Sequence, residues 1–134
     1  MDKNRILECI RFILSGFEEI DLAYVYGSFL KRDDFRDIDI AIHISRELAA
    51  YQRFKLSSKV AGSLEKKIQP RVEFDLRVLN CAPAYFQYEV ISQGMVVLER
   101  DQDMRVDYEA HLISEYLDLK YMYDRFDQDF LARA

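Results

Sequence analysis

Two short apolar runs joined by a charged stretch constrain the fold of this chain more than any other feature. The first run, residues 22–26, leads directly into Gly27-Ser28. The second, residues 38–42, has Asp37 and Asp39 at its start. Both runs have the length and the residue types of β-strands. Because the connection between them is short, we expect an antiparallel, hairpin-like pair.

Asp37 and Asp39 are two residues apart on the second predicted strand. Side chains at this spacing point to the same face, with Cα atoms roughly 7 Å apart at ~3.3 Å per residue. Two such carboxylates can share hard cations. The Gly27-Ser28 turn at the end of the neighbouring strand adds free backbone N–H groups suited to a phosphate. Metal ions beside a phosphate would suit nucleotidyl transfer.

Hydrophobic periodicity predicts a helix on each side of this strand pair. Asp2 is suited to cap a first helix, whose apolar stripe ends near Gly16. Ser45 is suited to cap a long second helix that continues through Ile68. That helix should stop before Pro70, since proline disfavours helical geometry in the residue ahead of it.

The second half of the chain predicts two more strands and two more helices. These are a strand over 72–79, a helix from Pro83 to Gly94, a strand over 95–98, and a final helix over about 104–131 capped by Asp101 or Asp103. We therefore expect an α/β (α+β) fold, in which helices flank a mixed sheet and a long helix ends the chain. The length favours one domain, residues 1–134.

The third predicted strand alternates apolar and charged residues, so that Glu73, Asp75 and Arg77 share one face. If this strand lies beside the second, Asp75 completes a group of three carboxylates with Asp37 and Asp39. Three facing carboxylates repel one another without a counter-charge, which argues for bound Mg²⁺. Arg77 would help to neutralise the group. The alternative is an ordinary solvated face of a sheet.

The net charge of -5 argues against a general nucleic-acid-binding protein, whose surface should be basic. Cys9 and Cys81 lack metal-ligand spacing, and we expect buried thiols. His43 and His111 show no spacing of ligands or of a catalytic pair. No apolar run approaches the ~20 residues that span a membrane. We expect a cytoplasmic protein without direct contact to membrane or nucleic acid.

The motifs resemble the nucleotidyltransferase superfamily of the DNA polymerase β type. They are Tyr26-Gly27-Ser28-Phe29, Asp37-Ile38-Asp39 and the later Asp75. The sequence is most similar to the minimal nucleotidyltransferases, MntA-type antitoxins paired with HEPN-domain toxins. This resemblance continues through residues 75–76, 79–80, 82–83, 91–94, 98–101 and 116–120. It departs at residues 29–36, a spacer about two residues shorter than the usual pattern, which could reshape the phosphate site.

The resemblance implies a polymerase β-like fold and Mg²⁺-dependent transfer of AMP from ATP to a tyrosine of a HEPN ribonuclease toxin. Asp37, Asp39 and Asp75 would be the catalytic and metal-binding residues for two Mg²⁺ ions. Nucleotide binding would involve three further residues, Gly27, Ser28 and Lys31.

Two alternatives remain open from the sequence. One is a non-catalytic antitoxin that neutralises its toxin by occlusion, and the other is a small-molecule nucleotidyltransferase. The final helix bears on the partner. For Leu112, Tyr116 and Leu119 we expect a core-facing stripe, whereas the late residues Met122, Phe126, Phe130 and Leu131 are predicted to be exposed. Exposed aromatic and Met side chains favour a protein interface, with the toxin or with another copy.

Overall fold

The computed structural model describes residues 2–68 and 72–133. Its elements follow one another in the order α1 (Lys3–Ser15), β1 (Ile20–Tyr26), α2 (Ser28–Lys31), β2 (Asp37–Ile44), α3 (Ala50–Lys67), β3 (Glu73–Val78), η1 (Leu79–Cys81), α4 (Ala84–Gln93), β4 (Met95–Glu99) and α5 (Gln102–Arg133). The predicted order of strands and longer helices is confirmed, and the short helices α2 and η1 are added to it.

The four strands form one mixed sheet in the order β3-β2-β1-β4. β1 pairs antiparallel with β2, as the short connection between them predicts, and its other edge pairs antiparallel with β4. β2 and β3 are parallel, and α3 is the crossover between them. As a result, the end of β1 and the starts of β2 and β3 lie at the same end of the sheet.

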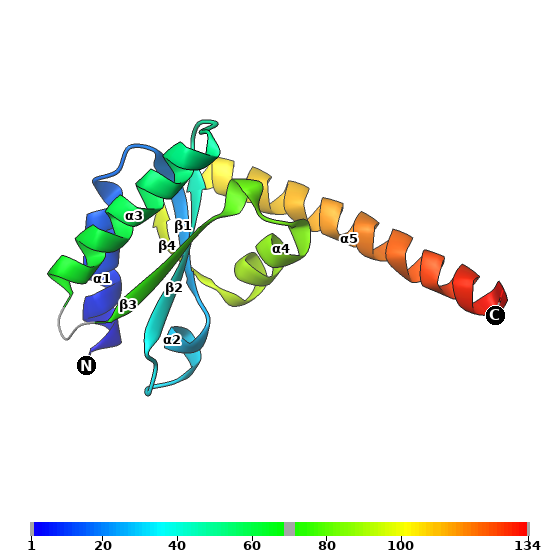
Figure 1. The fold of residues 1–134 in the computed structure, drawn as a ribbon, viewed down its shortest axis with the longest axis horizontal. Coiled ribbons are helices and arrows are strands. Elements are labelled where there is room, and N and C mark those ends of the chain that lie inside the picture. Colours follow the sequence, from blue (N-terminus) through cyan, green and yellow to red (C-terminus); the bar gives the residue numbers. More distant parts are fainter. Residues whose placement is uncertain (1, 69–71, 134) are drawn as a thin grey trace.

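Helices cover both faces of the sheet (Figure 1). α1 and α3 pack on one face, where their buried residues meet alternate residues of β2. These residues are Ile6, Ile10, Leu14, Leu56, Val60 and Leu64 of the helices with Ile38, Ile40 and Ile42 of the strand. α4 and the first turns of α5 cover the opposite face. Because β-strand side chains alternate, Asp37 and Asp39 belong to this second face.

Several predicted boundaries need correction. Ser45 does not cap α3, which begins at Ala50. Instead, the Ser45 backbone N–H donates to the Glu19 carbonyl oxygen, which ties residue 45 to the start of β1. The helix ends at Lys67 with Ile68 already extended, one residue before the predicted end and ahead of Pro70 as expected. Cys81 is exposed, so the expectation of a buried thiol is wrong there.

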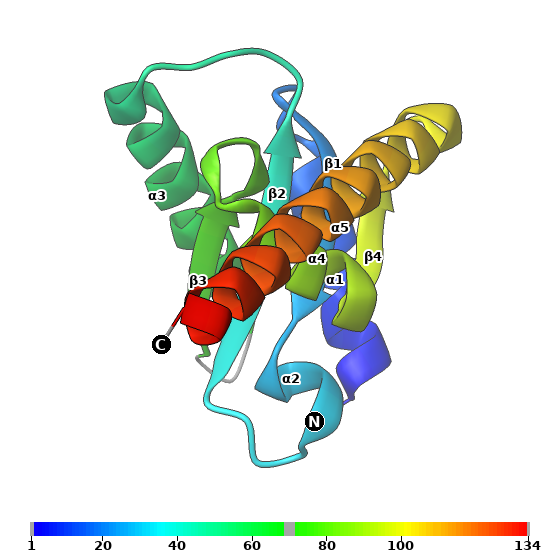
Figure 2. The ribbon, with the colours of Figure 1, turned by 90° about the vertical axis from the view of Figure 1, so that its right-hand side faces the viewer.

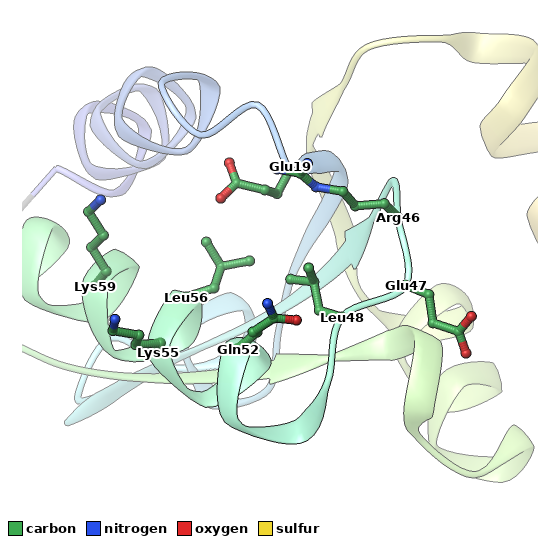
Figure 3. Close-up of a pocket in the computed structure, with 8 residues that line it drawn as sticks. All are labelled: Glu19, Arg46, Glu47, Leu48, Gln52, Lys55, Leu56 and Lys59. Atoms are coloured by element: carbon green, nitrogen blue, oxygen red, sulfur yellow. The ribbon is translucent and has the colours of Figure 1, made fainter.

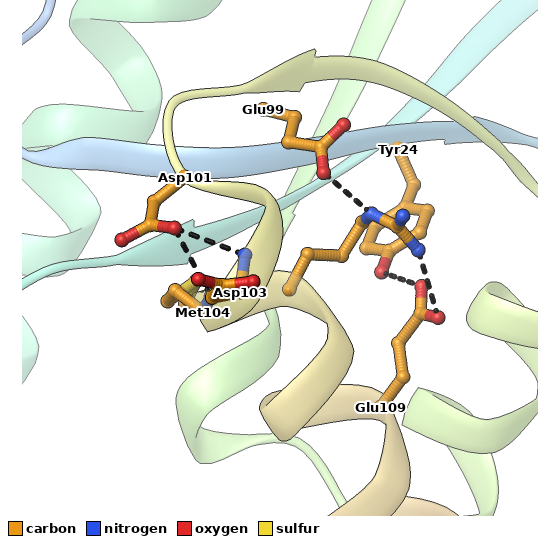
Figure 4. A network of polar contacts seen from close by, with 7 residues as sticks. Tyr24, Glu99, Asp101, Asp103, Met104 and Glu109 are labelled. Carbon is orange, nitrogen blue, oxygen red and sulfur yellow. Dashed lines mark hydrogen bonds and ion pairs between the residues drawn. The ribbon is translucent and has the colours of Figure 1, made fainter.

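The caps predicted for the first and last helices are confirmed. The carboxylate of Asp2 accepts a bond from the Asn4 backbone N–H at 3.0 Å. The carboxylate of Asp101 accepts bonds from the backbone N–H groups of Asp103 and Met104 (Figure 4). Such bonds satisfy N–H groups that have no partner within the helix.

A polar network attaches the first turns of α5 to the sheet. The Tyr24 hydroxyl donates to the Glu109 carboxylate at 2.6 Å (Figure 4). Arg105 bridges Glu109 and Glu99, at 3.2 and 2.8 Å. The second half of α5 extends away from the rest of the molecule (Figure 1), and in the view turned by 90° it points towards the viewer (Figure 2). Among the helices of residues 2–68 and 72–133, none has the length and apolar composition to cross a membrane.

Candidate active site

Strand register places three of the site residues in one row across the sheet. Tyr26 at the end of β1 pairs with Asp39 of β2, and Asp39 pairs with Asp75 of β3. Asp37 pairs with Glu73, two residues closer to the starts of β2 and β3. The predicted neighbourhood of Asp37, Asp39 and Asp75 is therefore correct, because the parallel crossover brings the starts of β2 and β3 together.

Gly27 is the link between this row and the turn that follows β1. Its φ is +83°, and among the described residues Gly27 alone has a left-handed φ. It precedes the single helical turn α2, which begins at Ser28. A Cβ atom at residue 27 would collide with the Asp39 carboxylate. Glycine is favoured here by its backbone conformation, and a larger residue would also have to displace the Asp39 carboxylate.

Asp39 is only partly exposed, and its surroundings raise the pKa of its carboxyl group. Burial is the largest cause, and the negative charges of Asp75 and Asp37 add to it. The positive charge of Arg77 opposes the shift. A carboxylate whose charge is disfavoured by two neighbouring carboxylates is electrostatically prepared for a cation.

Arg77 lies between the carboxylates and an aromatic wall. Its Nε is 3.6 Å from Asp75 Oδ2, and its guanidinium carbon is 5.4 Å from the centre of the Phe86 ring. Phe86 also contacts the Tyr26 ring edge to face, with centroids 5.8 Å apart. The arrangement agrees with the predicted role of Arg77 in neutralising the acidic group.

The Tyr26 hydroxyl is held in its protonated form by this site. Burial and the charge of Asp39 raise the pKa of Tyr26 to about 12. The sequence places Tyr26 in the motif beside Gly27 but assigns it no role, and it does not identify Phe86 or Gln93 as neighbours of the site. The aromatic residue immediately before Gly27 is the one signal in the sequence that could have indicated such a wall.

Lys31 extends from α2 towards the C-terminal end of α4, where its Nζ donates to the Gln93 side-chain oxygen at 3.1 Å. This contact places an ammonium group beside the turn of Gly27 and Ser28. Arg32, by contrast, forms an ion pair with Asp34 at 3.0 Å. Lys31 thus points towards α4, whereas the Arg32 guanidinium is held by Asp34.

The short spacer between Ser28 and Asp37 has a packed interior. The rings of Phe29 and Phe35 contact each other edge to face, with centroids 4.7 Å apart. Lys3 of α1 lies over both rings and donates to the Arg32 carbonyl oxygen at 2.7 Å. The turn is therefore fixed by α1 and by its own aromatic pair despite its length.

In the described part of the chain, no three His, Cys, Asp or Glu side chains lie close enough to hold one metal ion together. Asp37, Asp39 and Asp75 share one end of the sheet without forming a closed set of ligands. Their chemistry nonetheless fits Mg²⁺, because this cation prefers oxygen ligands and is usually held by one or two carboxylates plus water and substrate phosphates.

His43 lies away from the carboxylates of the candidate site and pairs with an aspartate that the sequence spacing did not predict. His43 Nδ1 lies 2.8 Å from Asp21 Oδ1, at the far end of β2 from Asp37. A cavity of about 830 Å³ also lies at that far end (Figure 3). Its lining combines basic, acidic and apolar side chains: Glu19, Arg46, Glu47, Leu48, Gln52, Lys55, Leu56 and Lys59. It contains none of the predicted site residues.

Three comparisons relate this geometry to known proteins. The family profile described as Polymerase beta, Nucleotidyltransferase matches residues 8–103. The protein adenylyltransferase MntA of Shewanella oneidensis is 27% identical over 105 residues, covering 77% of this chain and 69% of that protein.

Solved structures share the fold. A chain from the Shewanella oneidensis complex of a tri-AMPylated HEPN toxin with an MNT antitoxin aligns with TM-score 0.71 and 22% identity, covering 97% of this chain and 99% of the other. A chain from a toxin–antitoxin structure with AMP-PNP aligns with TM-score 0.70 and 23% identity, covering 98% and 99%. With the profile spanning most of the sequence, this chain belongs to the polymerase β nucleotidyltransferase family.

Proposed function

We propose that this chain is an antitoxin that transfers AMP from ATP to a tyrosine of a HEPN ribonuclease toxin and thereby neutralises it. The observation that supports this proposal most is the register that places Asp39 between Tyr26 and Asp75, directly beside Gly27. The similarity of this chain to MntA, and to a solved complex of an MNT antitoxin with an AMPylated HEPN toxin, supports a HEPN toxin as the acceptor. The reaction would take place in the cytoplasm, where a toxin that cleaves cellular RNA would act.

The reaction requires one bond to form and one to break. The phenolic oxygen of the toxin's tyrosine attacks the α-phosphorus of ATP, and the bond from that phosphorus to the oxygen bridging to the β-phosphate breaks. AMP is then joined to the tyrosine, and pyrophosphate leaves. Asp75, the more exposed of the paired carboxylates, can accept the proton of the attacking hydroxyl.

The residues around Gly27 would hold the nucleotide. Gly27 allows the backbone to approach the phosphates closely, and Ser28 supplies a hydroxyl and N–H groups of the following turn. Lys31 would exchange its contact with Gln93 for the negatively charged phosphates. These residues therefore bind and orient the triphosphate.

Asp37, Asp39 and Asp75 would hold two Mg²⁺ ions. When bound, such ions neutralise charge on the attacking and leaving oxygens of an in-line displacement. The mutual repulsion that raises the pKa of Asp39 would be relieved by this binding. The same three carboxylates would therefore coordinate the cations, and the repulsion among them would favour cation binding.

The test is the intact mass of a purified HEPN toxin after incubation with this chain, ATP and Mg²⁺. We expect increments of one AMP, absent with Asp39→Asn and retained with Asp107→Asn, a substitution of an exposed carboxylate on α5. Inhibition of the toxin without any mass change would contradict the proposal and support occlusion alone. Increments on a small-molecule alcohol, with none on the toxin, would support the small-molecule alternative.

A further inference from the structure

Charge is unevenly distributed over the molecule. α1 and α3, which cover one face of the sheet, carry eight basic and two acidic residues between them. These two helices therefore have a net charge of +6, whereas the whole chain has a net charge of -5. The net charge, from which we expect no contact with nucleic acid, is thus an average over a basic part and an acidic part. A basic face attracts ligands that carry phosphates.

The exposed lysines of α3 form a row along the helix. Lys55, Lys59 and Lys66 are exposed, and their spacings of four and seven residues place them on the same side of α3. The row extends over about 16 Å at 1.5 Å per residue. Among residues 2–68 and 72–133, no carboxylate forms an ion pair with Lys55 or Lys59. Their ammonium groups are therefore available to an anion.

The cavity of about 830 Å³ at the far end of β2 from Asp37 adjoins this row, because Lys55 and Lys59 belong to its lining (Figure 3). Arg46 adds a third cation, and two leucines add apolar surface. Of the two lining glutamates, Glu47 points away from the other lining side chains (Figure 3). The cavity thus combines positive charge with apolar contact, which suits a ligand that has both phosphates and flat apolar groups.

Two aromatic rings lie at the start of the lysine row. Tyr51 and Phe54 are each 70% exposed, and a spacing of three residues makes them neighbours on the surface of α3. Lys55 Nζ lies 5.8 Å from the centre of the Tyr51 ring. Exposed rings on a basic surface are the platforms on which the bases of single-stranded nucleic acids stack.

The choice of lysine favours phosphates over an acidic protein as the ligand. Lysine is depleted at protein–protein interfaces, whereas its ammonium group is a common ligand of phosphate. We call the surface formed by these α3 side chains the α3 basic face: Tyr51, Phe54, Lys55, Lys59 and Lys66.

We propose that the α3 basic face binds single-stranded nucleic acid. The lysine row follows the phosphates of the strand, and the two rings stack on its bases. α3 packs on the sheet face opposite to that of Asp37 and Asp39, so a bound strand leaves the carboxylates accessible. The proposal does not depend on AMP transfer. Together with the proposed function, it would hold the chain on the RNA that its toxin cleaves.

The first test measures binding of the full chain to a labelled single-stranded RNA of about 12 nucleotides, by fluorescence anisotropy at several salt concentrations. Lys55→Gln/Lys59→Gln should weaken binding on the order of 10-fold at about 0.1 M salt. It should also lower the slope of log affinity against log salt by about 1.4, since each lost phosphate contact removes about 0.7. The matched control is Lys120→Gln/Arg125→Gln, two exposed cations of α5, which should change neither quantity.

The second test addresses stacking. Tyr51→Ala/Phe54→Ala should weaken binding of the single strand at least about fivefold and leave the salt slope unchanged, because the lost contacts are uncharged. The matched control is Tyr121→Ala/Tyr123→Ala on α5, whose rings are 63% and 67% exposed and should not contribute. A DNA strand of the same sequence distinguishes the two sources of such a ligand, and binding of either strand supports the proposal.

Three results would overturn the proposal. One is the absence of binding, or an equal loss of affinity in the α3 and α5 variants. Another is equally tight binding of an RNA duplex that Tyr51→Ala/Phe54→Ala does not affect. The third is a dimer at low salt, without RNA binding, that Lys55→Gln/Lys59→Gln dissociates, which would assign the face to self-association.

This proposal and the proposed function fail separately. The α3 variants should transfer AMP to a HEPN toxin at the wild-type rate, because the substituted residues lie away from the carboxylates. If the chain binds RNA but transfers no AMP, the proposed function is wrong and the α3 basic face stands. If Lys55→Gln/Lys59→Gln slows transfer while RNA binding is unchanged, the face contacts protein and the nucleic-acid proposal is wrong.

Discussion

The carboxylate of Asp39 fills the space in which a side chain on Gly27 would begin. Gly27 directly follows β1 and Asp39 lies near the start of β2, so the two residues are distant in sequence and adjacent in space. The turn that would hold phosphate and the carboxylate that would hold a cation are therefore in direct contact.

Gly27→Ala should damage both stability and transfer. The new methyl group strains a left-handed φ and pushes Asp39 aside, so we expect a loss of about 1–3 kcal/mol in the free energy of unfolding. Urea denaturation and AMP transfer are the measurements. Gly62→Ala is the matched control: a methyl group at residue 62 of α3 meets nothing within 4 Å and should stabilise the chain by about 0.4–1 kcal/mol. Equal stability of the two variants would contradict the role of Gly27.

Asp39→Asn should lower transfer on the order of 100-fold or more while raising stability at neutral pH. The folded-state pKa of Asp39 is raised, chiefly by burial and then by Asp75 and Asp37. Its stabilising contribution is thus present below the unfolded pKa and lost as pH rises through the folded pKa. Thermal unfolding of the variant should therefore occur above that of the wild type at pH 7, and the difference should shrink towards pH 3. A wild type more stable than the variant at pH 7 without metal would contradict the raised pKa of Asp39.

Mg²⁺ should stabilise the wild-type chain against heat. A ligand that binds only the folded state, at ten times its Kd, adds about 1.4 kcal/mol. We expect EDTA to remove the gain, and Asp39→Asn and Asp75→Asn to lack it. Asp107→Asn should respond like the wild type. If both site variants keep the full response, the ion binds elsewhere.

Arg77→Gln should move the acidic limb of the pH–rate profile to higher pH. Arg77 lowers the pKa of Asp39, so its removal makes ionisation of Asp39 harder. Transfer requires the ionised carboxylate in our proposal, and activity should therefore begin to fall at a higher pH than in the wild type. Arg46→Gln, at the opposite end of β2, should leave the limb in place. A shift to lower pH would show that Arg77 does not neutralise this group.

Lys31→Ala should weaken ATP binding more than it slows the chemical step. Lys31 is held by Gln93 beside the Gly27-Ser28 turn, and removal of one phosphate contact should raise the KM for ATP by about 10-fold. Arg32→Ala is the neighbouring control, because the Arg32 side chain is engaged by Asp34. Steady-state kinetics with varied ATP distinguishes the two. A larger effect of Arg32→Ala would reverse the assignment.

Much of the sheet could be predicted because its signals are local. Apolar runs marked β1 and β2, and the period-two pattern of residues 73–78 marked both β3 and the shared face of Asp75 and Arg77. That β3 lies beside β2 had to be assumed, because periodicity does not specify which strands are neighbours. In the structure β3 is the parallel neighbour of β2, and helix α3 connects the two strands.

What could not be predicted depends on contacts between distant residues. Ser45 has the chemistry of a helix cap, but its N–H bonds to Glu19 instead, and α3 begins five residues later with Gln52 bonding back to the Ala49 N–H. The wall of Tyr26 and Phe86 and the contact of Lys31 with Gln93 likewise join residues far apart in the chain. Strong local propensity gives way at such places to tertiary packing.

The position of β3 at the edge of the sheet has a kinetic consequence. Asp75 lies beside Asp39 only when β3 is paired with β2, a contact between distant parts of the sequence, and such contacts slow folding. An edge strand is also among the parts that open most readily in a folded protein. A newly made or partly opened chain would thus lose its third carboxylate while the pairing of β1 with β2 survives, so catalytic competence would depend on completed folding.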